Sequence, residues 1–254
     1  MLPVLTCQAV SKSFVLRTNR QYLLKERVLA WVRPHLRESR QTFWALQDVS
    51  FTVEPGESFG VIGPNGSGKT TLLRIVAGIF RPTSGTVRVR GRIAPLLSLG
   101  VGFHPELTGR ENIYLNAALF GFTTREILEI EQTIIHFSEL ERFIDVPTKN
   151  YSAGMQVRLG FSIALEVKPD IFLMDEVFAV GDAHFHQKCV RRLAEERLAQ
   201  RTFVIATHSL PLVEETCDRA GLIVRGQMVA VGTAKEVVQR YRELLAQEEG
   251  GARG

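Results

Sequence analysis

A glycine-rich run, GPNGSGKTT, occupies Gly63 to Thr71 and joins two apolar segments. The segment before it, Ser58 to Ile62, is typical of a buried strand, and the segment after it, Leu72 to Ile79, is typical of a helix. Glycine lets the backbone turn tightly and point several N–H groups at one anion, and the following helix adds the positive end of its dipole. The run therefore predicts a phosphate-binding loop.

The spacing within this loop assigns roles to its side chains. Gly63, Gly68, Lys69 and Thr70 match the P-loop pattern, whose lysine reaches the β- and γ-phosphates and whose hydroxyl binds Mg²⁺. A chance match is the alternative, and the strand before the loop and the helix after it argue against that alternative. The predicted ATP-binding residues of the loop are Gly63, Pro64, Asn65, Gly66, Ser67, Gly68, Lys69, Thr70 and Thr71.

Two further strands end in polar side chains. Ile171 to Met174 predicts a buried strand, and Asp175 and Glu176 follow it at its carboxyl end. We expect Asp175 at the Mg²⁺ ion and Glu176 beside the γ-phosphate, where it would deprotonate an attacking water. His208 follows another buried strand at the same edge of the sheet. The alternatives are a solvated acidic pair and a structural histidine.

Composition sets the broad class of the chain. Of its 254 residues, 45% are hydrophobic and 23% charged, as in ordinary water-soluble domains. No apolar run approaches the ~20 residues of a membrane span, and the N-terminus lacks the features of a signal peptide. The three cysteines are scattered without metal-binding spacing, which favours a reducing compartment. The net charge is +4, and Arg17 to Arg40 contains seven basic and two acidic residues, so the rest of the chain is close to neutral.

Strands and helices are predicted to alternate along most of the chain. Strands are expected at Val4–Phe14, with a turn at Ser11–Ser13, and at 44–53, 58–62, 171–174, 202–206, 222–224 and 228–231, with two short ones in 86–97. Helices are expected at 183–199, 209–217 and 234–247, and residues 107–168 are mostly helical, with Thr108 and Thr123 as helix caps. This order predicts an α/β fold with a mainly parallel sheet.

The segment YSAGM, Tyr151 to Met155, is a second candidate anion site. Ser152 is expected to cap a helix that runs through MQVRLGFSIALEV, although alternating apolar residues there could also indicate a strand. Small polar residues at a helix start suit an anion, but many helices begin in this way.

These motifs, in this order, resemble the ATP-binding domain of ABC transporters over about Val4 to Gly232. GPNGSGKTT is similar to the Walker A motif, IFLMDE to Walker B with its catalytic glutamate, YSAGM to the signature motif, AVGD to the D-loop and His208 to the switch histidine. The resemblance implies a P-loop ATPase fold with an N-terminal antiparallel β subdomain and an inserted helical subdomain at about 107–168. It also implies that Glu176 and His208 are catalytic and that Thr70 and Asp175 bind the metal.

The same resemblance implies a homodimer in which two copies pair head to tail. Each ATP would lie between the P-loop of one copy and the signature residues of the other, Ser152, Ala153, Gly154 and Met155, with Asp182 in the D-loop. An aromatic residue would stack on the adenine, and Phe14 and Phe43 are both candidates. ATP and Mg²⁺ are the expected ligands.

A finer resemblance is to the exporters of O-antigen, capsule and teichoic acid. FWALQDVSF, LLSLGVGFHPELTGRENIYLN and DEVFAVGD are similar to that group, as is the insertion at about 17–42 with its amphipathic helix Gln21–Val32. It implies a peripheral ATPase at the cytoplasmic face of the inner membrane, bound to a membrane permease that moves lipid-linked polysaccharide. The ATP-binding domain would span 1–240, followed by a helix end and tail at 241–254 without a carbohydrate-binding domain. Another ABC transporter, or a soluble ABC ATPase on DNA or ribosomes, is the alternative, and no nucleic acid partner is expected.

The chain departs from the family pattern at two places. Tyr151, Ala153 and Met155 replace the usual leucine, glycine and glutamine of the signature motif, while Ser152 and Gly154 are kept. The Q-loop glutamine is missing from Ser98 to Pro105. The basic segment 17–40 either covers its own domain or lies at anionic lipid and the permease, where each basic residue contributes ~1 kcal/mol.

Overall fold

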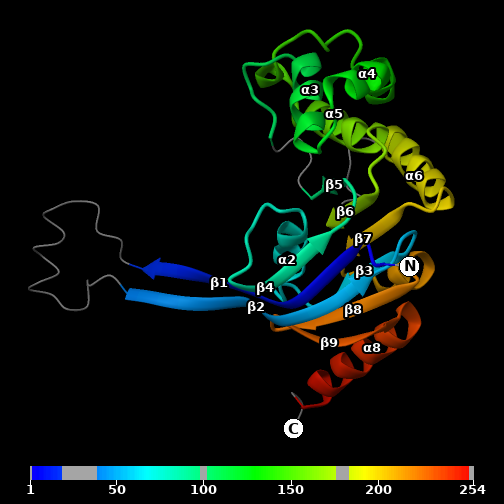
Figure 1. The fold of residues 1–254 in the computed structure, drawn as a ribbon. Coiled ribbons are helices and arrows are strands. Elements are labelled where there is room, and N and C mark those ends of the chain that lie inside the picture. The colour runs from blue at the N-terminus through cyan, green and yellow to red at the C-terminus, as the bar shows by residue number, and fades with distance from the viewer. Residues whose placement is uncertain (1, 19–38, 98–101, 176–182, 252–254) are drawn as a thin grey trace, which may run out of the picture.

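The structure is a computed structural model, and it describes residues 2–18, 39–97, 102–175 and 183–251. The predicted amphipathic helix Gln21–Val32, together with Glu176 and Asp182, lies outside the described residues. The described residues form two sheets and a separate block of helices, which lies at the upper end of the molecule in Figure 1. The predicted α/β fold with a mainly parallel sheet is confirmed.

The larger sheet has six strands in the order β5-β6-β7-β3-β8-β9. Neighbouring strands are parallel, except that β9 pairs with β8 in an antiparallel hairpin at one edge. The bounds are β3 Ser58–Ile62, β5 Ile93–Leu96, β6 Ile171–Asp175, β7 Thr202–Ala206, β8 Arg219–Val224 and β9 Gln227–Thr233. The carboxyl ends of β3, β6 and β7 therefore lie at the same edge.

The central strands are buried on both faces, which explains their continuous apolar sequences. In β6, Ile171 and Leu173 join one core cluster, while Phe172 and Met174 join another. Residues Phe203 to Ala206 of β7 alternate in the same way. Because successive side chains of a strand point to opposite faces, the six-stranded sheet separates the two clusters.

The smaller sheet is antiparallel, with strand order β2-β1-β4. Its strands are β1 Leu5–Thr18, β2 Ser39–Val53 and β4 Ser84–Val89, and the helix α2, Lys69–Val76, packs between the two sheets within one core cluster. The turn predicted at Ser11–Ser13 is wrong, because β1 continues through this segment. Register shifts on both sides of Lys12 show local bulges, which account for the small polar residues there.

The helical block has its own hydrophobic core, built from α3 Gly109–Leu119, α4 Thr124–Ser138 and α5 Ala153–Glu166, with a short 3₁₀ turn at Thr148–Asn150. Thr108 and Thr123 each form a capping box with the glutamate three residues later, so both predicted caps are confirmed. The Ser152 side chain caps α5, so the alternating apolar residues of this segment belong to a helix.

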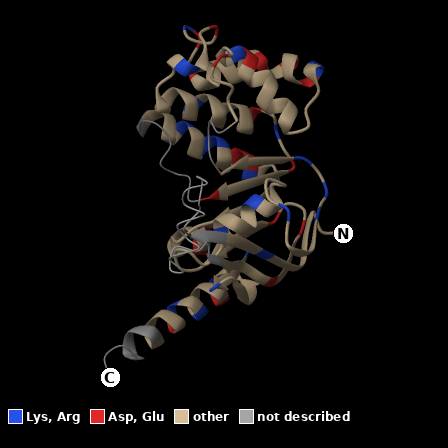
Figure 2. Cartoon of the chain, turned by 90° about the vertical axis from the view of Figure 1, so that its left-hand side faces the viewer, with Lys and Arg blue, Asp and Glu red and all other residues tan. Residues whose placement is uncertain are grey.

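The remaining helices cover the sheet face opposite α2. They are α6 Ala183–Leu198, α7 Leu210–Thr216 and α8 Ala234–Gly251. The sequence predicts that the last helix ends at Gln247, but α8 continues to Gly251. Acidic and basic residues are interspersed along α8 in Figure 2. Within the described residues, no helix has both the length and the apolar character needed to cross a membrane.

Asn112 ties the entrance of the helical block to α3. Its side chain is fully buried, and its Nδ2 lies 2.9 to 3.1 Å from the carbonyl oxygens of His104, Leu107 and Thr108. Its Oδ1 accepts a hydrogen bond of 2.8 Å from the His104 N–H. One buried amide therefore satisfies several backbone groups that have left regular secondary structure.

Replacing Asn112 with alanine removes the acceptor of the His104 N–H, whereas the carbonyl oxygens of His104, Leu107 and Thr108 keep other backbone donors. We expect Asn112→Ala to lower the free energy of unfolding by about 1–3 kcal/mol, since a hydrogen-bonding group left unsatisfied inside the protein costs ~1–3 kcal/mol. Urea unfolding measures this loss. Asn150→Ala is the matched control, because Asn150 is exposed. Equal losses in the two variants would contradict the role given to Asn112.

Candidate functional site

The glycine loop joins β3 to α2 at the carboxyl edge of the large sheet. Gly68 caps α2 with φ 110° and offers no side chain to the N–H groups of the first turn, which an anion can therefore satisfy. Pro64, Asn65 and Gly66 are exposed and form the outer side of the loop, whereas Ser67 is buried. Thr70 and Thr71 are partly buried in the first turn of α2.

Lys69 lies inside this loop. Its side chain is buried, and its Nζ donates to the carbonyl oxygens of Gly63 at 2.8 Å and Pro64 at 3.1 Å. The backbone thus holds the positive charge at the centre of the loop, where it adds to the positive end of the α2 dipole. Such an arrangement suits a polyanion such as a triphosphate.

A buried hydroxyl group in the loop also suits a phosphate group. The Ser67 Oγ is buried, and among the described residues it has no hydrogen-bond partner. Buried hydroxyl groups normally have a partner, and one without a partner among the described residues, in a loop with a buried lysine at a helix start, suits a phosphate oxygen. The sequence predicts Ser67 as a loop residue, and this geometry gives it a specific donor role.

Sequence reasoning missed the contact that braces the loop. The tight turn of the β8–β9 hairpin, Arg225 and Gly226, has positive φ values of 48° and 81°. The Gly226 N–H donates to the Ser67 carbonyl at 3.0 Å, and the Gly226 carbonyl accepts from the Gln47 N–H at 2.8 Å. Gly63 packs so closely on the Ile223 carbonyl that a Cβ there would clash with it. The dipeptide Arg-Gly predicts the turn, but not what the turn contacts.

The predicted metal and switch residues lie along the same edge. Asp175 ends β6 and is in register with Ala206 at the end of β7, so His208 lies two residues beyond the level of Asp175. β7 is the neighbour of β3, and α2 packs across β6 and β7, which brings Thr70 and Asp175 toward one side of the loop. Glu176 and Asp182 follow Asp175 outside the described residues.

The signature segment lies in the helical block, in a different core from the loop. Ser152 caps α5, accepting a hydrogen bond of 3.2 Å from the Met155 N–H, and Ser152, Ala153 and Gly154 are exposed. Tyr151 is buried just before them, and its hydroxyl donates to the Phe143 carbonyl at 2.7 Å. Burial, with the charge of Asp145, raises the pKa of Tyr151 to about 12. The tyrosine therefore anchors an exposed helix start.

The candidate adenine-stacking residues Phe14 and Phe43 lie on the paired strands β1 and β2. Phe14 and Phe43 are direct partners in the β1–β2 register, and the Phe14 ring packs edge-on against Phe80 at 5.7 Å. Phe80 follows the C-terminal end of α2, about 12 Å from the loop at ~1.5 Å per residue. Trp44, which sequence reasoning did not single out, is 43% exposed and directly precedes Ala45, whose carbonyl packs against Gly68.

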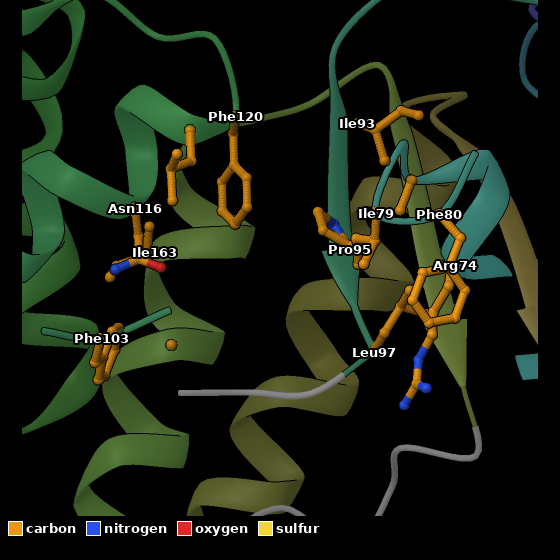
Figure 3. Close-up of a pocket in the computed structure, with 13 residues that line it drawn as sticks. Arg74, Ile79, Phe80, Ile93, Pro95, Leu97, Phe103, Asn116, Phe120 and Ile163 are labelled. Atoms are coloured by element: carbon orange, nitrogen blue, oxygen red, sulfur yellow. The ribbon is translucent and has the colours of Figure 1, made fainter. Parts of the chain in front are cut away.

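A cavity of about 510 Å³ separates the helical block from the core. Phe103, Asn116, Phe120 and Ile163 line one side in Figure 3, and residues after α2 and along β5 line the other. Ile79 and Leu119 also line it, with 58% and 69% of their side chains exposed. Of the segment that lacks the Q-loop glutamine, residues 98–101 lie outside the described residues.

Known proteins resemble this chain in sequence and in fold. The ABC transporter family matches residues 46–179. The O-antigen export system ATP-binding protein RfbB of Klebsiella pneumoniae is 42% identical over 246 residues, covering 97% of this chain and 100% of that protein. The teichoic acids export ATP-binding protein TagH of Listeria monocytogenes serotype 4b (strain F2365) is 42% identical over 208 residues, 82% of this chain and 62% of that protein. A dimeric ATP-binding cassette, MJ0796, in a post-hydrolysis state bound to ADP and Pi, has a TM-score of 0.67 at 21% identity, covering 91% of this chain and 98% of that one.

The brace on the loop gives a prediction with a matched control. Gly226 and Gly121 both have positive φ, of 81° and 87°, but a Cβ at Gly226 would lie 2.8 Å from the Ala45 carbonyl, whereas a Cβ at Gly121 meets nothing within 4 Å. Both alanine variants should lose ~1–2 kcal/mol of stability from the left-handed backbone. We expect only Gly226→Ala to raise the KM for ATP several-fold, as measured by steady-state hydrolysis. An unchanged KM would show that the hairpin does not shape the loop.

Proposed function

Because this chain belongs to the ABC transporter family, as its motifs predict, we propose that it is the ATP-hydrolysing subunit of an exporter of lipid-linked polysaccharide. One observation carries the proposal: 42% identity to an O-antigen export protein over that protein's whole length. The buried lysine in the loop, and the Ser67 hydroxyl that has no partner in the part of the chain that the structure describes, support nucleotide binding. We place the chain as a peripheral subunit at the cytoplasmic face of the inner membrane, and the polymer is O-antigen, capsule or teichoic acid by class.

We propose that the loop residues bind the ATP phosphates, with Lys69 neutralising the β- and γ-phosphates. Thr70 and Asp175 would hold Mg²⁺, which neutralises phosphate charge when bound. Glu176 would be the general base and His208 would contact the γ-phosphate. The adenine would stack on an aromatic of the hairpin, and Trp44, beside the loop contact at Ala45, joins Phe14 and Phe43 as a candidate.

The second anion site of the chain is proposed to serve another copy. Ser152, Ala153, Gly154 and Met155 form the start of α5, where the first three are exposed, in a core separate from that of the loop. In a head-to-tail homodimer this helix start would cover the ATP bound by the partner's Lys69, with Asp182 of the D-loop at the interface. ATP binding would then close the dimer, and hydrolysis would open it.

The permease is proposed to contact the cavity between the helical block and the core. Exposed apolar side chains such as Ile79 and Leu119 at its rim are typical of a protein interface. The cavity lies between the core that carries the loop and the helical block that carries the signature segment. A permease segment bound there would therefore contact both parts and could follow movement between them. The basic segment 17–40 is proposed to bind anionic lipid or the permease.

If each ATP site is made by two copies of the chain, two inactive variants should complement each other. Lys69→Ala should abolish ATP binding by its own loop, and Ser152→Arg should block the site of its partner. Each variant alone should show less than ~1% of parental turnover, since both sites of the homodimer are broken. A mixture should regain activity, because a mixed dimer has one complete site. Steady-state ATPase assays measure this recovery, and its absence over all mixing ratios would contradict the shared site.

Capture of the permease tests the exporter assignment. Glu176→Gln should keep ATP binding, lose turnover and hold the dimer closed with ATP and Mg²⁺. Tagged Glu176→Gln should then purify a multi-span membrane protein from its host's membranes, identified by mass spectrometry.

Two exposed leucines, one at the cavity and one away from it, provide a matched pair of variants for this capture. Leu119→Glu should abolish the capture, and Leu128→Glu should not, because Leu128 is 65% exposed but does not line the cavity. A soluble complex with nucleic acid or ribosomes would instead support the alternative ABC ATPase. Turnover by Glu176→Gln close to that of the parent would remove Glu176 from the base role.

A further inference from the structure

Glu139 adopts an unusual backbone conformation at the end of α4. Its φ of 59° and ψ of 34° lie in the left-handed region, where the residue after a helix is usually glycine or asparagine. A glutamate retains this strained conformation only where its surroundings require it, and such positions often serve function. The contacts of the Glu139 carboxylate therefore need to be considered together with this backbone.

Each carboxylate oxygen of Glu139 binds a different helix. Oε2 accepts from Arg158 Nη1 of α5 at 3.0 Å, and Oε1 accepts from Lys188 Nζ of α6 at 3.1 Å. The same Lys188 Nζ donates to the Phe137 carbonyl in the last turn of α4 at 2.9 Å, and His184 Nδ1 lies 3.8 Å from Oε1. Burial raises the pKa of Glu139, but the hydrogen bond and charge of Lys188, with the charges of Arg158 and His184, bring it below its usual value. The ionised carboxylate thus joins α4, α5 and α6.

Aromatic rings of α4, α5 and α6 pack together beside these contacts of Glu139. The Phe185 ring of α6 packs edge-on against Phe137 of α4 at 5.9 Å and against Phe161 of α5 at 6.5 Å. The Arg158 guanidinium lies 5.1 Å from the Phe185 ring centre, and Lys188 Nζ lies 4.7 Å from that of Phe137. Phe185 is fully buried in the cluster that includes Met174 of β6. The junction is therefore continuous with the strand that ends at Asp175.

The two helices held by Glu139 lead to the two halves of the ATP site. α5 starts at Ser152, the exposed cap of the signature segment, and α6 is the first helix after Asp175. We propose that Glu139 is a positioning residue that holds α5 against α6. It would thereby fix the position of the signature segment, which is presented to the partner, relative to β6, which carries the proposed metal ligand Asp175. This inference rests on the proposed function, in which the signature segment completes the partner's ATP site.

The proposal predicts an effect on turnover rather than on ATP binding. Glu139→Gln keeps the size of the side chain and removes its charge, so the chain's own loop is intact while α5 is less firmly placed. We expect kcat for ATP hydrolysis to fall about tenfold, with KM for ATP unchanged within about twofold. Glu139→Asp, which keeps the carboxylate, should retain most of the parental kcat.

The same ion pair can be removed from its other side, by substituting Lys188. Lys188→Met keeps the Glu139 carboxylate, removes the hydrogen bonds of Lys188 to Glu139 and to the Phe137 carbonyl, and should lower kcat by a similar factor. The double variant Glu139→Gln, Lys188→Met should lose little more than either single variant, because both changes remove one shared interaction. Should Glu139→Gln fail to fold, Lys188→Met alone decides the question by the same criteria.

An ion pair within the core is the matched control. Glu214 of α7 accepts from both terminal nitrogens of Arg242 of α8, at 2.9 and 3.0 Å, and its side chain is 28% exposed, compared with 33% for Glu139. This pair also joins two helices, but neither of them is α5 or α6. We expect Glu214→Gln to keep the parental kcat within about twofold, whatever its effect on thermal stability.

Two results would overturn the proposal. Glu139→Gln and Lys188→Met could lower the melting temperature but keep the parental kcat, which would make the junction purely structural. Alternatively, the loss could appear in KM alone, which would place it at the chain's own loop. ATP-dependent dimerisation of the Glu176→Gln chain, measured by light scattering, tests the proposed function separately: a monomer there contradicts the shared site, whereas a dimer with fully active Glu139→Gln contradicts only the role of Glu139.

Discussion

The backbone of the glycine loop is held by hydrogen bonds that pass through Gly226, a residue about 160 positions later in the chain. Its N–H binds the Ser67 carbonyl and its own carbonyl binds the Gln47 N–H, so the loop is fixed to both sheets at once. An anion site made of N–H groups works only if those groups already point at the anion, since reorganising them on binding would cost affinity. The hairpin and the antiparallel sheet thus serve the loop, and the rest of the fold is arranged around that contact.

Where the chain is buried on both faces, its sequence was sufficient to predict the structure. The predicted bounds of β3 and β7 agree with the structure, and those of β6 differ by one residue, because a strand inside a parallel sheet is a continuous apolar run closed by polar residues. Thr108, Thr123 and Ser152 were found as caps since a cap is a local hydrogen bond. The bulges of β1 and the length of α8 were missed, because register shifts and helix ends depend on small differences between neighbouring residues.

Some residues of the candidate site could be predicted from the sequence, and others could not. The loop residues, Asp175 and His208 were predicted from motif order, and the structure places all of them at the carboxyl edge of the sheet. Their functional roles stay predictions. The brace at Gly226 and the exposure of Trp44 beside Ala45 could not be predicted, because they join segments that are distant in sequence and carry no local signal. Glu139 gave no signal either, since a left-handed glutamate looks like any other glutamate in the sequence.

The altered signature motif is explained by its packing. Tyr151 stands where the family has leucine, and its ring is buried in the core of the helical block while its hydroxyl binds the Phe143 carbonyl. Gly109 faces that hydroxyl, and a Cβ there would clash with it. The substitution thus adds a hydrogen bond to an apolar anchor and leaves Ser152 and Gly154 exposed. The exposed cap is thus anchored on one side by Tyr151, and α5 is held on another by Glu139. In the proposed homodimer, these contacts would fix the helix start that each copy presents to the ATP of the other.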